Sequence, residues 1–149
     1  MVILSLLHFV RRGPLESTAH RDLAVIESTL RAGQMTPLHM HPGDEALEVV
    51  DGDVTVFLGS DATRLGAGDS LVLPGREAHA LRAEGGRARI RTASFVASVS
   101  RYEDFLRAVA TPAAVGFVED SLEAIAAANG IRVLGAPGAL PGARGEAAA

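Results

Sequence analysis

Two histidines, His39 and His41, lie two residues apart in this chain and are followed by Glu45. Residues i and i+2 of an extended strand point to the same face, so both imidazoles can converge on one point from positions about 6–7 Å apart. The Pro42-Gly43 pair predicts a turn that lets Glu45 return to the same point from the next strand. Imidazole and carboxylate groups that meet in this way form a site for a divalent first-row metal ion.

A second pattern lies further along the chain. It has a glycine at Gly68, a short apolar run, the turn residues Pro74 and Gly75, and then His79 at the start of the next extended segment. His79 is therefore a candidate for a further ligand. With these residues in view, Gly33-x5-His39-x-His41-x3-Glu45-x6-Gly52 resembles the first conserved motif of the cupin superfamily at every position, and Gly68-x5-Pro74-x4-His79 resembles the second.

The resemblance covers about residues 20–98. It implies a small antiparallel β-barrel that holds one divalent metal ion inside on four side chains: His39, His41, Glu45 and His79. The chain departs from the second motif at two positions. Arg76 stands where the family usually has glycine, with Gly75 one position early, and Ala83 stands where the family often has asparagine.

A lone His-x-His pair is more often two ordinary histidines than a metal site. The joint pattern is different, because three of the five histidines fall on motif positions with the glycines and the proline in register. The other two, His8 and His20, match no motif, and we interpret them as structural or solvent-exposed residues.

Short alternating segments separated by turn residues predict strands within residues 2–10, 22–32, 47–49, 54–58, 71–73, 78–83 and 87–99. Asp51-Gly52 lies between two such runs and predicts a β-hairpin. Gly85-Gly86 predicts a turn before the last long strand. Strands of this length and spacing favour a barrel or sandwich without any appeal to a family.

The pattern changes at Ser100. Ser100 and Glu103 form a capping box, and the apolar residues that follow recur at helical spacing until Pro112. A second helix is predicted over residues 118–129, with Gly130 as its C-terminal stop.

We therefore expect an all-β fold, a small antiparallel β-barrel or jelly roll of the cupin type, with two C-terminal α-helices. The expected organisation is an N-terminal strand and loop over 1–20 that contributes to a dimer interface, a β-barrel over 21–99, C-terminal helices over 100–134 and a flexible tail over 135–149. A short strand is expected within residues 131–134.

Composition limits the partners. The chain has 149 residues, which suits one domain, and its formal net charge of −4 gives no electrostatic footprint for nucleic acid. It has no cysteine, so disulfides and thiolate ligands are excluded. The apolar run at residues 2–10 is too short for a membrane span and lacks the flanks of a signal peptide. We expect a cytoplasmic homodimer that binds a small-molecule substrate.

A shell of three histidines and one carboxylate leaves coordination positions open, which is typical of a catalytic site. Mn²⁺, Fe²⁺, Co²⁺, Ni²⁺ and Zn²⁺ all accept these ligands. If Glu45 leaves the metal ion, it becomes a general base beside the substrate. Arg76 could hold a substrate carboxylate or could be a solvated turn residue.

A single-domain cupin with two C-terminal helices is similar to the quercetin 2,3-dioxygenase-type proteins, which implies oxygen-dependent cleavage of a small enol or carbonyl substrate chelated to the metal ion. Two alternatives stay open. One is a redox-neutral metal-dependent cyclase, isomerase, lyase or decarboxylase. The other is a small-molecule-binding cupin without catalysis.

Overall fold

The computed structural model describes residues 5–8, 22–96, 126–128 and 130–142. These residues form strands that pair antiparallel throughout. The strands are β1 (Ser5–His8), β2 (Asp22–Leu30), β3 (Leu38–Met40), β4 (Glu45–Leu58), β5 (Asp61–Gly66), β6 (Ser70–Leu73), β7 (His79–Val96) and β8 (Arg132–Gly135). The predicted all-β, antiparallel fold is confirmed.

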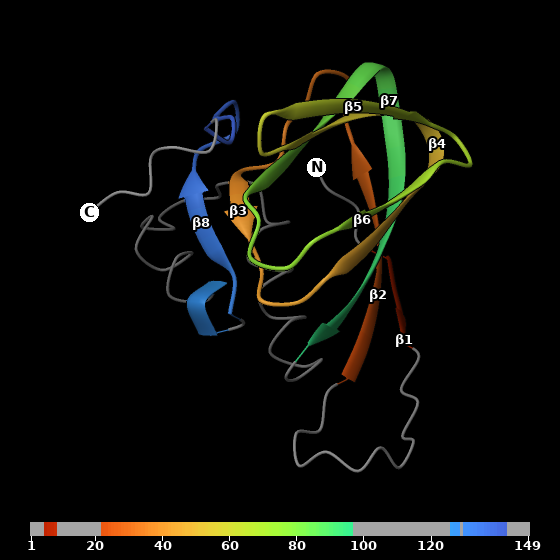
Figure 1. Cartoon of the computed structure of the whole chain (residues 1–149). Helices are drawn as coiled ribbons and strands as arrows, with labels where there is room; N and C mark the ends of the chain where they lie inside the picture. The colour runs from red at the N-terminus through yellow and green to blue at the C-terminus, as the bar shows by residue number, and fades with distance from the viewer. Residues whose placement is uncertain (1–4, 9–21, 97–125, 129, 143–149) are drawn as a thin grey trace, which may run out of the picture.

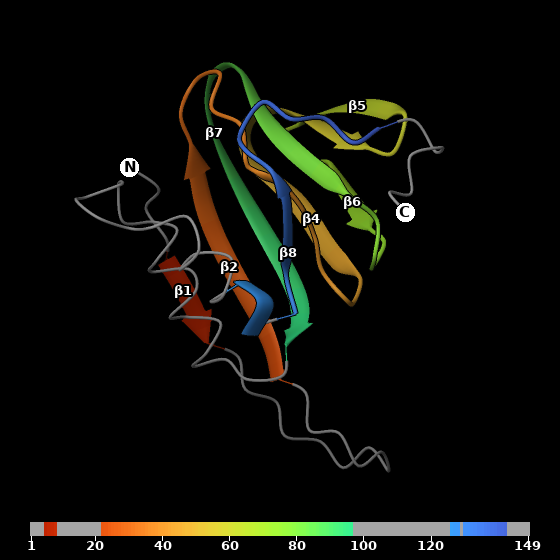
Figure 2. The same cartoon turned by 90° about the vertical axis from the view of Figure 1, so that its left-hand side faces the viewer.

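The two long strands, β4 and β7, run through the whole fold (Figures 1 and 2). They pair with each other twice, first over residues 45–51 with 89–94 and then over 53–58 with 79–84. Around the first pairing, β2 and β1 extend the sheet beyond β7, and β6 extends it beyond β4. Around the second, β3 and β8 lie beyond β7, and β5 lies beyond β4. The start of β7 and the start of β4 therefore belong to different halves of the fold.

The predicted hairpin at Asp51-Gly52 is wrong, because β4 continues through these residues as one strand. The predicted turn at Gly85-Gly86 is wrong for the same reason, since β7 runs unbroken from His79 to Val96. Gly52 and the Gly85-Gly86 pair lie where the pairing register of β4 and β7 shifts. Extra residues at such a bulge bend the strand without reversing it. The glycines thus let two long strands pass from one half of the fold to the other.

The core lies between the two halves of the fold. Along β4, every second side chain is buried at the beginning of the strand, and the buried set continues after the bend. Leu47, Val49, Val54 and Val56 are each at most 1% exposed, as is Leu73 of β6. The core is wholly aliphatic at these positions, and the buried polar side chains among the described residues, Glu45 and His79, lie at its end.

The arginines of β7 lie on the opposite face from this core, as their alternation predicts. Arg91 bonds to Glu48 at 3.0 Å and to Glu27 at 3.3 Å, and Arg89 lies 3.4 Å from Glu27. Each of these positive charges therefore has a carboxylate beside it on the same sheet.

Little of the predicted helical region can be compared with the structure. The predicted helix that follows Ser100 lies outside the described residues, and of the second only 126–128 is described, as helix. Gly130 follows it with φ at 73°, and the amides of Gly130 and Ile131 bond to the carbonyls of Ala127 and Ala126. This is the glycine-terminated helix end that the sequence predicts. Within the described part of the chain, no helix has the length and apolar character needed to cross a bilayer.

Candidate metal centre

Three short stretches of backbone bring the predicted ligands together. His39 lies in β3, His41 follows β3 directly, Glu45 opens β4 and His79 opens β7. His39 and His79 face each other in the β3–β7 pairing. Just before β3, Thr36 fixes this alignment, because its amide donates to the carbonyl of Leu81 at 2.9 Å and its hydroxyl accepts from the Leu81 amide at 3.0 Å.

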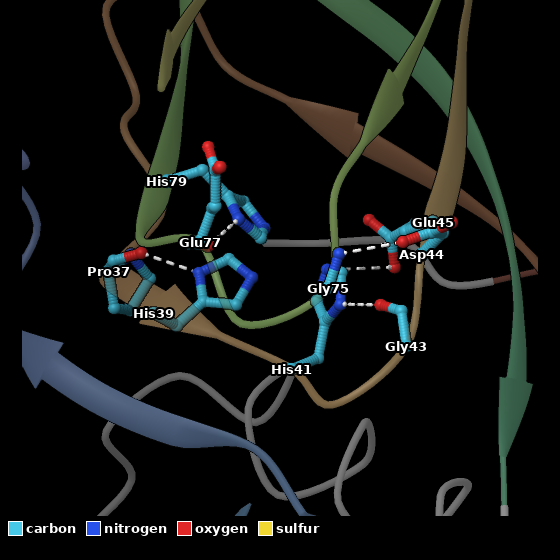
Figure 3. Close-up of polar contacts among 9 residues, drawn as sticks. All are labelled: Pro37, His39, His41, Gly43, Asp44, Glu45, Gly75, Glu77 and His79. Carbon is cyan, nitrogen blue, oxygen red and sulfur yellow. Dashed lines mark hydrogen bonds and ion pairs between the residues drawn. The ribbon is translucent and has the colours of Figure 1, made fainter. Parts of the chain in front are cut away.

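The ligand atoms of His41, Glu45 and His79 all lie within 4.8 Å of one another. The ring centroid of His79 lies 4.7 Å from that of His41 and 4.5 Å from that of His39. The centroids of His39 and His41 are 6.2 Å apart, so the three rings lie at the corners of a triangle in which His79 is the nearest neighbour of each of the other two. Figure 3 shows the three imidazoles facing a common space. The structure thus groups three of the four predicted ligands, and the assignment of His39 as the fourth stays a prediction.

All three imidazoles use Nδ1 in the same way. Nδ1 of His39 bonds to the carbonyl oxygen of Pro37 at 2.8 Å. Nδ1 of His41 bonds to the carbonyl of Gly43 at 2.6 Å, and Nδ1 of His79 to that of Glu77 at 2.9 Å. A carbonyl oxygen only accepts, so each Nδ1 carries the proton. The neutral ring then presents an unprotonated Nε2, and metal-binding histidines are oriented by bonds of this kind.

The Nε2 atoms of His41 and His79 are buried, and neither has a hydrogen-bond partner among the described residues. An unsatisfied buried polar atom costs about 1–3 kcal/mol, so two in one place need a physical reason. Nε2 of His41 lies 3.9 Å from Oε2 of Glu45. Atoms that share one metal ion, each about 2.0–2.2 Å from it, lie at most about 4.4 Å apart. The distance between His41 and Glu45 fits a shared cation, which would give the buried Nε2 of His41 a partner.

Burial sets the protonation of the cluster. Burial, and to a smaller extent the neighbouring His39, lower the pKa of His79 to about 4. Burial also lowers the pKa of His39 and of His41. In contrast, burial raises the pKa of Glu45 to about 7. At neutral pH the three imidazoles are therefore neutral, and the carboxyl group of Glu45 is close to half ionised.

The loop before His79 explains one departure from the cupin motif. Arg76 has φ at 64°, the left-handed conformation that glycine adopts without cost. Arg76 therefore has a backbone conformation for which glycine is better suited. Gly75 is needed for a different reason, because a Cβ atom there would lie 2.7 Å from the carbonyl oxygen of Pro42. The loop thus lies in close contact with the 42–44 turn.

The sequence did not reveal which groups orient the ligands. The three carbonyls that accept from Nδ1 belong to Pro37, Gly43 and Glu77. Every residue type has a backbone carbonyl, so the sequence cannot show which ones accept these bonds. Asp44, whose Oδ1 accepts from the amide of Gly75 at 2.9 Å, was also missed. An aspartate beside a turn glycine was a weak signal for such a bond.

The chain is thus an antiparallel jelly roll that carries a histidine and carboxylate cluster able to hold a metal ion. Residues 26–94 match the protein family described as the cupin domain. This range holds both motifs and all four predicted ligands. No curated protein sequence gives a significant match.

Solved structures of cupins share the fold. A cupin superfamily protein from Desulfitobacterium hafniense DCB-2 superposes with a TM-score of 0.51 at 16% identity, over 63% of this chain and 76% of that one. KdgF from Halomonas sp. gives a TM-score of 0.51 at 21% identity, with the same coverage. A cupin 2 conserved barrel domain protein from Leptotrichia buccalis gives 0.50 at 20% identity, over 62% of this chain and 40% of that one. At these identities the likeness concerns the fold alone.

Proposed function

We propose that this protein is a metal-dependent cupin enzyme with one divalent ion held by His41, Glu45 and His79, and with His39 as the fourth ligand. The observation that carries the proposal is the pair of buried Nε2 atoms in the cluster with Glu45, for which the described part of the chain offers no hydrogen-bond partner. Their Nδ1 atoms are already committed to backbone carbonyls, so each ring has only Nε2 free to bind a cation.

The donor set fits a borderline divalent ion. Imidazole and carboxylate ligands suit Fe²⁺, Ni²⁺, Mn²⁺, Co²⁺ and Zn²⁺, and the chain has no cysteine to add a thiolate. When bound, such an ion polarises a carbonyl or enol oxygen of the substrate as a Lewis acid. His41 and His79 need no deprotonation at neutral pH, because burial already lowers their pKa.

Glu45 is the residue to which we assign proton transfer. Without a bound ion, burial raises its pKa to about 7, so Glu45 suits general acid or base catalysis near neutral pH once its carboxylate has left the metal ion. A substrate with an enol hydroxyl, or with a hydrogen next to a carbonyl, presents a proton that the Glu45 carboxylate can accept. We therefore propose a small enol or carbonyl compound as the substrate class.

The leading reaction is a quercetinase-like dioxygenation of such a substrate, as the resemblance to quercetin 2,3-dioxygenase-type proteins implies. The raised pKa of Glu45 favours a second candidate, a redox-neutral isomerisation, cyclisation or elimination, since this chemistry depends on one group that both accepts and returns a proton. A cupin that binds a small molecule without catalysis remains the non-enzyme alternative.

The proposal also covers the binding partners and the cellular location of the protein. We propose a cytoplasmic homodimer that acts on a small molecule and binds neither nucleic acid nor membrane. The pairing of Arg89 and Arg91 with carboxylates on their own sheet supports only the expected lack of nucleic-acid binding, because it leaves little net positive charge at those positions.

Metal analysis tests the centre. We expect protein purified without added metal to carry close to one divalent ion per chain, identified by elemental analysis. His41→Ala and His79→Ala should each fall well below that stoichiometry. A His39→Ala protein that keeps its full metal content would remove His39 from the ligand set and leave the other three in place.

Oxygen dependence then separates the two reactions. Candidate enol and carbonyl compounds are supplied to the metal-loaded protein with an oxygen electrode in place. Uptake of one O₂ per substrate consumed supports the dioxygenase, whereas equal turnover under strict anaerobiosis supports the redox-neutral enzyme. Tight substrate binding with no turnover in either condition supports the non-catalytic binding protein.

A further inference from the structure

Asp44 joins two segments that are far apart in the sequence. Its Oδ1 accepts a hydrogen bond from the amide of Gly75 at 2.9 Å, across 31 positions of the chain (Figure 3). One partner lies in the turn that connects β3 to β4, and the other in the loop that connects β6 to β7. The two segments deliver different ligands, since the turn leads from His41 to Glu45 and the loop leads to His79.

A second bond and a close backbone contact surround this link. The amide of Arg76 donates to the carbonyl of His41 at 2.7 Å. A Cβ atom on Gly75 would lie 2.7 Å from the carbonyl oxygen of Pro42 and 2.8 Å from the carbonyl carbon of Gly43. The loop therefore lies directly against the turn, backbone to backbone.

The same two segments orient the imidazoles of His41 and His79. The carbonyl of Gly43, next to Asp44, accepts from Nδ1 of His41. The carbonyl of Glu77, two residues after Gly75, accepts from Nδ1 of His79. A shift of the loop relative to the turn would move both carbonyls apart, and it would turn the two Nε2 atoms away from a common point.

The loop needs support from outside itself. Arg76 holds a left-handed backbone at φ 64°, which side chains other than glycine adopt only at an energetic cost. Nothing in the residue type of Arg76 favours this conformation. The hydrogen bond from Gly75 to Asp44 fixes the residue directly before it.

We propose that Asp44 is a positioning residue of the metal centre: its carboxylate holds the 74–77 loop against the 42–44 turn, so that His41 and His79 aim at one ion. Asp44 is exposed and lies outside the ligand cluster, so it acts through the backbone. The inference rests on the proposed metal centre.

The test compares Asp44→Ala with Asp44→Asn, which keeps an oxygen acceptor for the Gly75 amide. Asp69→Ala is the matched control, because Asp69 is also exposed and also accepts from a backbone amide, that of Gly66 at 2.8 Å. For each protein, the affinity for Zn²⁺ is measured by competition with a chromophoric chelator, the visible absorption spectrum is recorded with Co²⁺, and the unfolding of the metal-free form is followed by denaturant.

We expect Asp44→Ala to bind Zn²⁺ about 10–100-fold more weakly, the range seen when groups that orient metal ligands are removed. Its Co²⁺ spectrum should also change. Asp44→Asn should stay within about threefold of the unsubstituted protein, and Asp69→Ala should keep both affinity and spectrum even if its stability falls.

Three results would overturn the assignment. Unchanged affinity and spectrum in Asp44→Ala would give Asp44 a structural role only. A loss in Asp44→Asn equal to that in Asp44→Ala would assign the effect to charge. Absence of Zn²⁺ and Co²⁺ binding by the unsubstituted protein would refute the metal centre itself, and this failure is recognised separately because it does not depend on any Asp44 variant.

Discussion

The carboxyl group of Glu45 has to ionise before it can bind a metal ion. Its pKa is raised to about 7 by burial, whereas the pKa of His79 is lowered to about 4. Between these values the ring of His79 is already neutral, so of these two groups it is Glu45 that supplies a proton when a metal ion binds. Affinity should therefore fall as pH falls below 7. From this group alone, we expect Zn²⁺ to bind about fivefold more weakly at pH 6 than at pH 7.

Calorimetry in two buffers of different ionisation enthalpy measures this proton directly. The protein should release close to one proton per Zn²⁺ at pH 6, and much less from this source at pH 8. Glu45→Gln is the control, because glutamine keeps the shape but has no proton to lose in this range. The same proton release from Glu45→Gln at pH 6 would show that another group titrates.

The backbone conformation of Arg76 gives a second prediction about a single residue. A left-handed backbone costs a non-glycine residue about 1–2 kcal/mol, and the added freedom of glycine in the unfolded chain returns about 0.4–1 kcal/mol of that. Arg76→Gly should therefore raise the free energy of unfolding of the metal-free protein by up to about 1 kcal/mol, measured by denaturant unfolding. Arg87→Gly, at an exposed strand position of β7, should lower it by about 0.5–1 kcal/mol. Destabilisation by both changes would mean that the Arg76 side chain makes a contact that offsets its strain.

At the scale of the elements, the crossing of β4 and β7 depends on Gly52. Its φ is 78°, and a Cβ atom there would lie 2.5 Å from the carbonyl oxygen of Arg87 and 2.9 Å from Cα of Ala88. Gly52→Ala combines backbone strain with a clash against β7, so it should destabilise the protein by about 2–4 kcal/mol. Gly85→Ala is the matched control, since Gly85 has φ at 68° but open space around its missing Cβ. It should cost about 1–2 kcal/mol, and equal losses in the two variants would show that the close approach at Gly52 is relieved by a small shift.

This crossing is also where sequence reasoning reached its limit. Asp51-Gly52 has the local chemistry of a hairpin turn, and in a short two-stranded unit it would act as one. Here β7 pairs with β4 on both sides of the glycine, and that long-range pairing decides between a reversal and a bend. The convergence of His39 and His41 could be predicted without knowledge of long-range pairing. His39 and His41 are brought to one face by the two-residue period of a strand, which is a local property.

At the scale of the whole molecule, the candidate centre joins parts of the chain that pair in different halves of the fold. Glu45 begins the first pairing of β4 with β7, next to Ser94, whereas His79 begins the second, next to Leu58. An ion shared by these two residues and His41 closes the long loops of chain between them. Metal binding should therefore stabilise the folded state as a unit, because the unfolded chain does not hold these ligands together.

The last prediction measures this coupling through the thermal midpoint. With free Zn²⁺ at 1,000 times its dissociation constant, binding adds about 4.1 kcal/mol, which for a chain of this size raises Tm by about 10 °C above the value in a chelator. His79→Ala loses one of the clustered ligands, so its Tm should hardly differ between Zn²⁺ and chelator. The comparison within each protein removes the cost of the substitution itself. A metal-dependent rise in His79→Ala as large as in the unsubstituted protein would place the stabilising ion at some other group of residues.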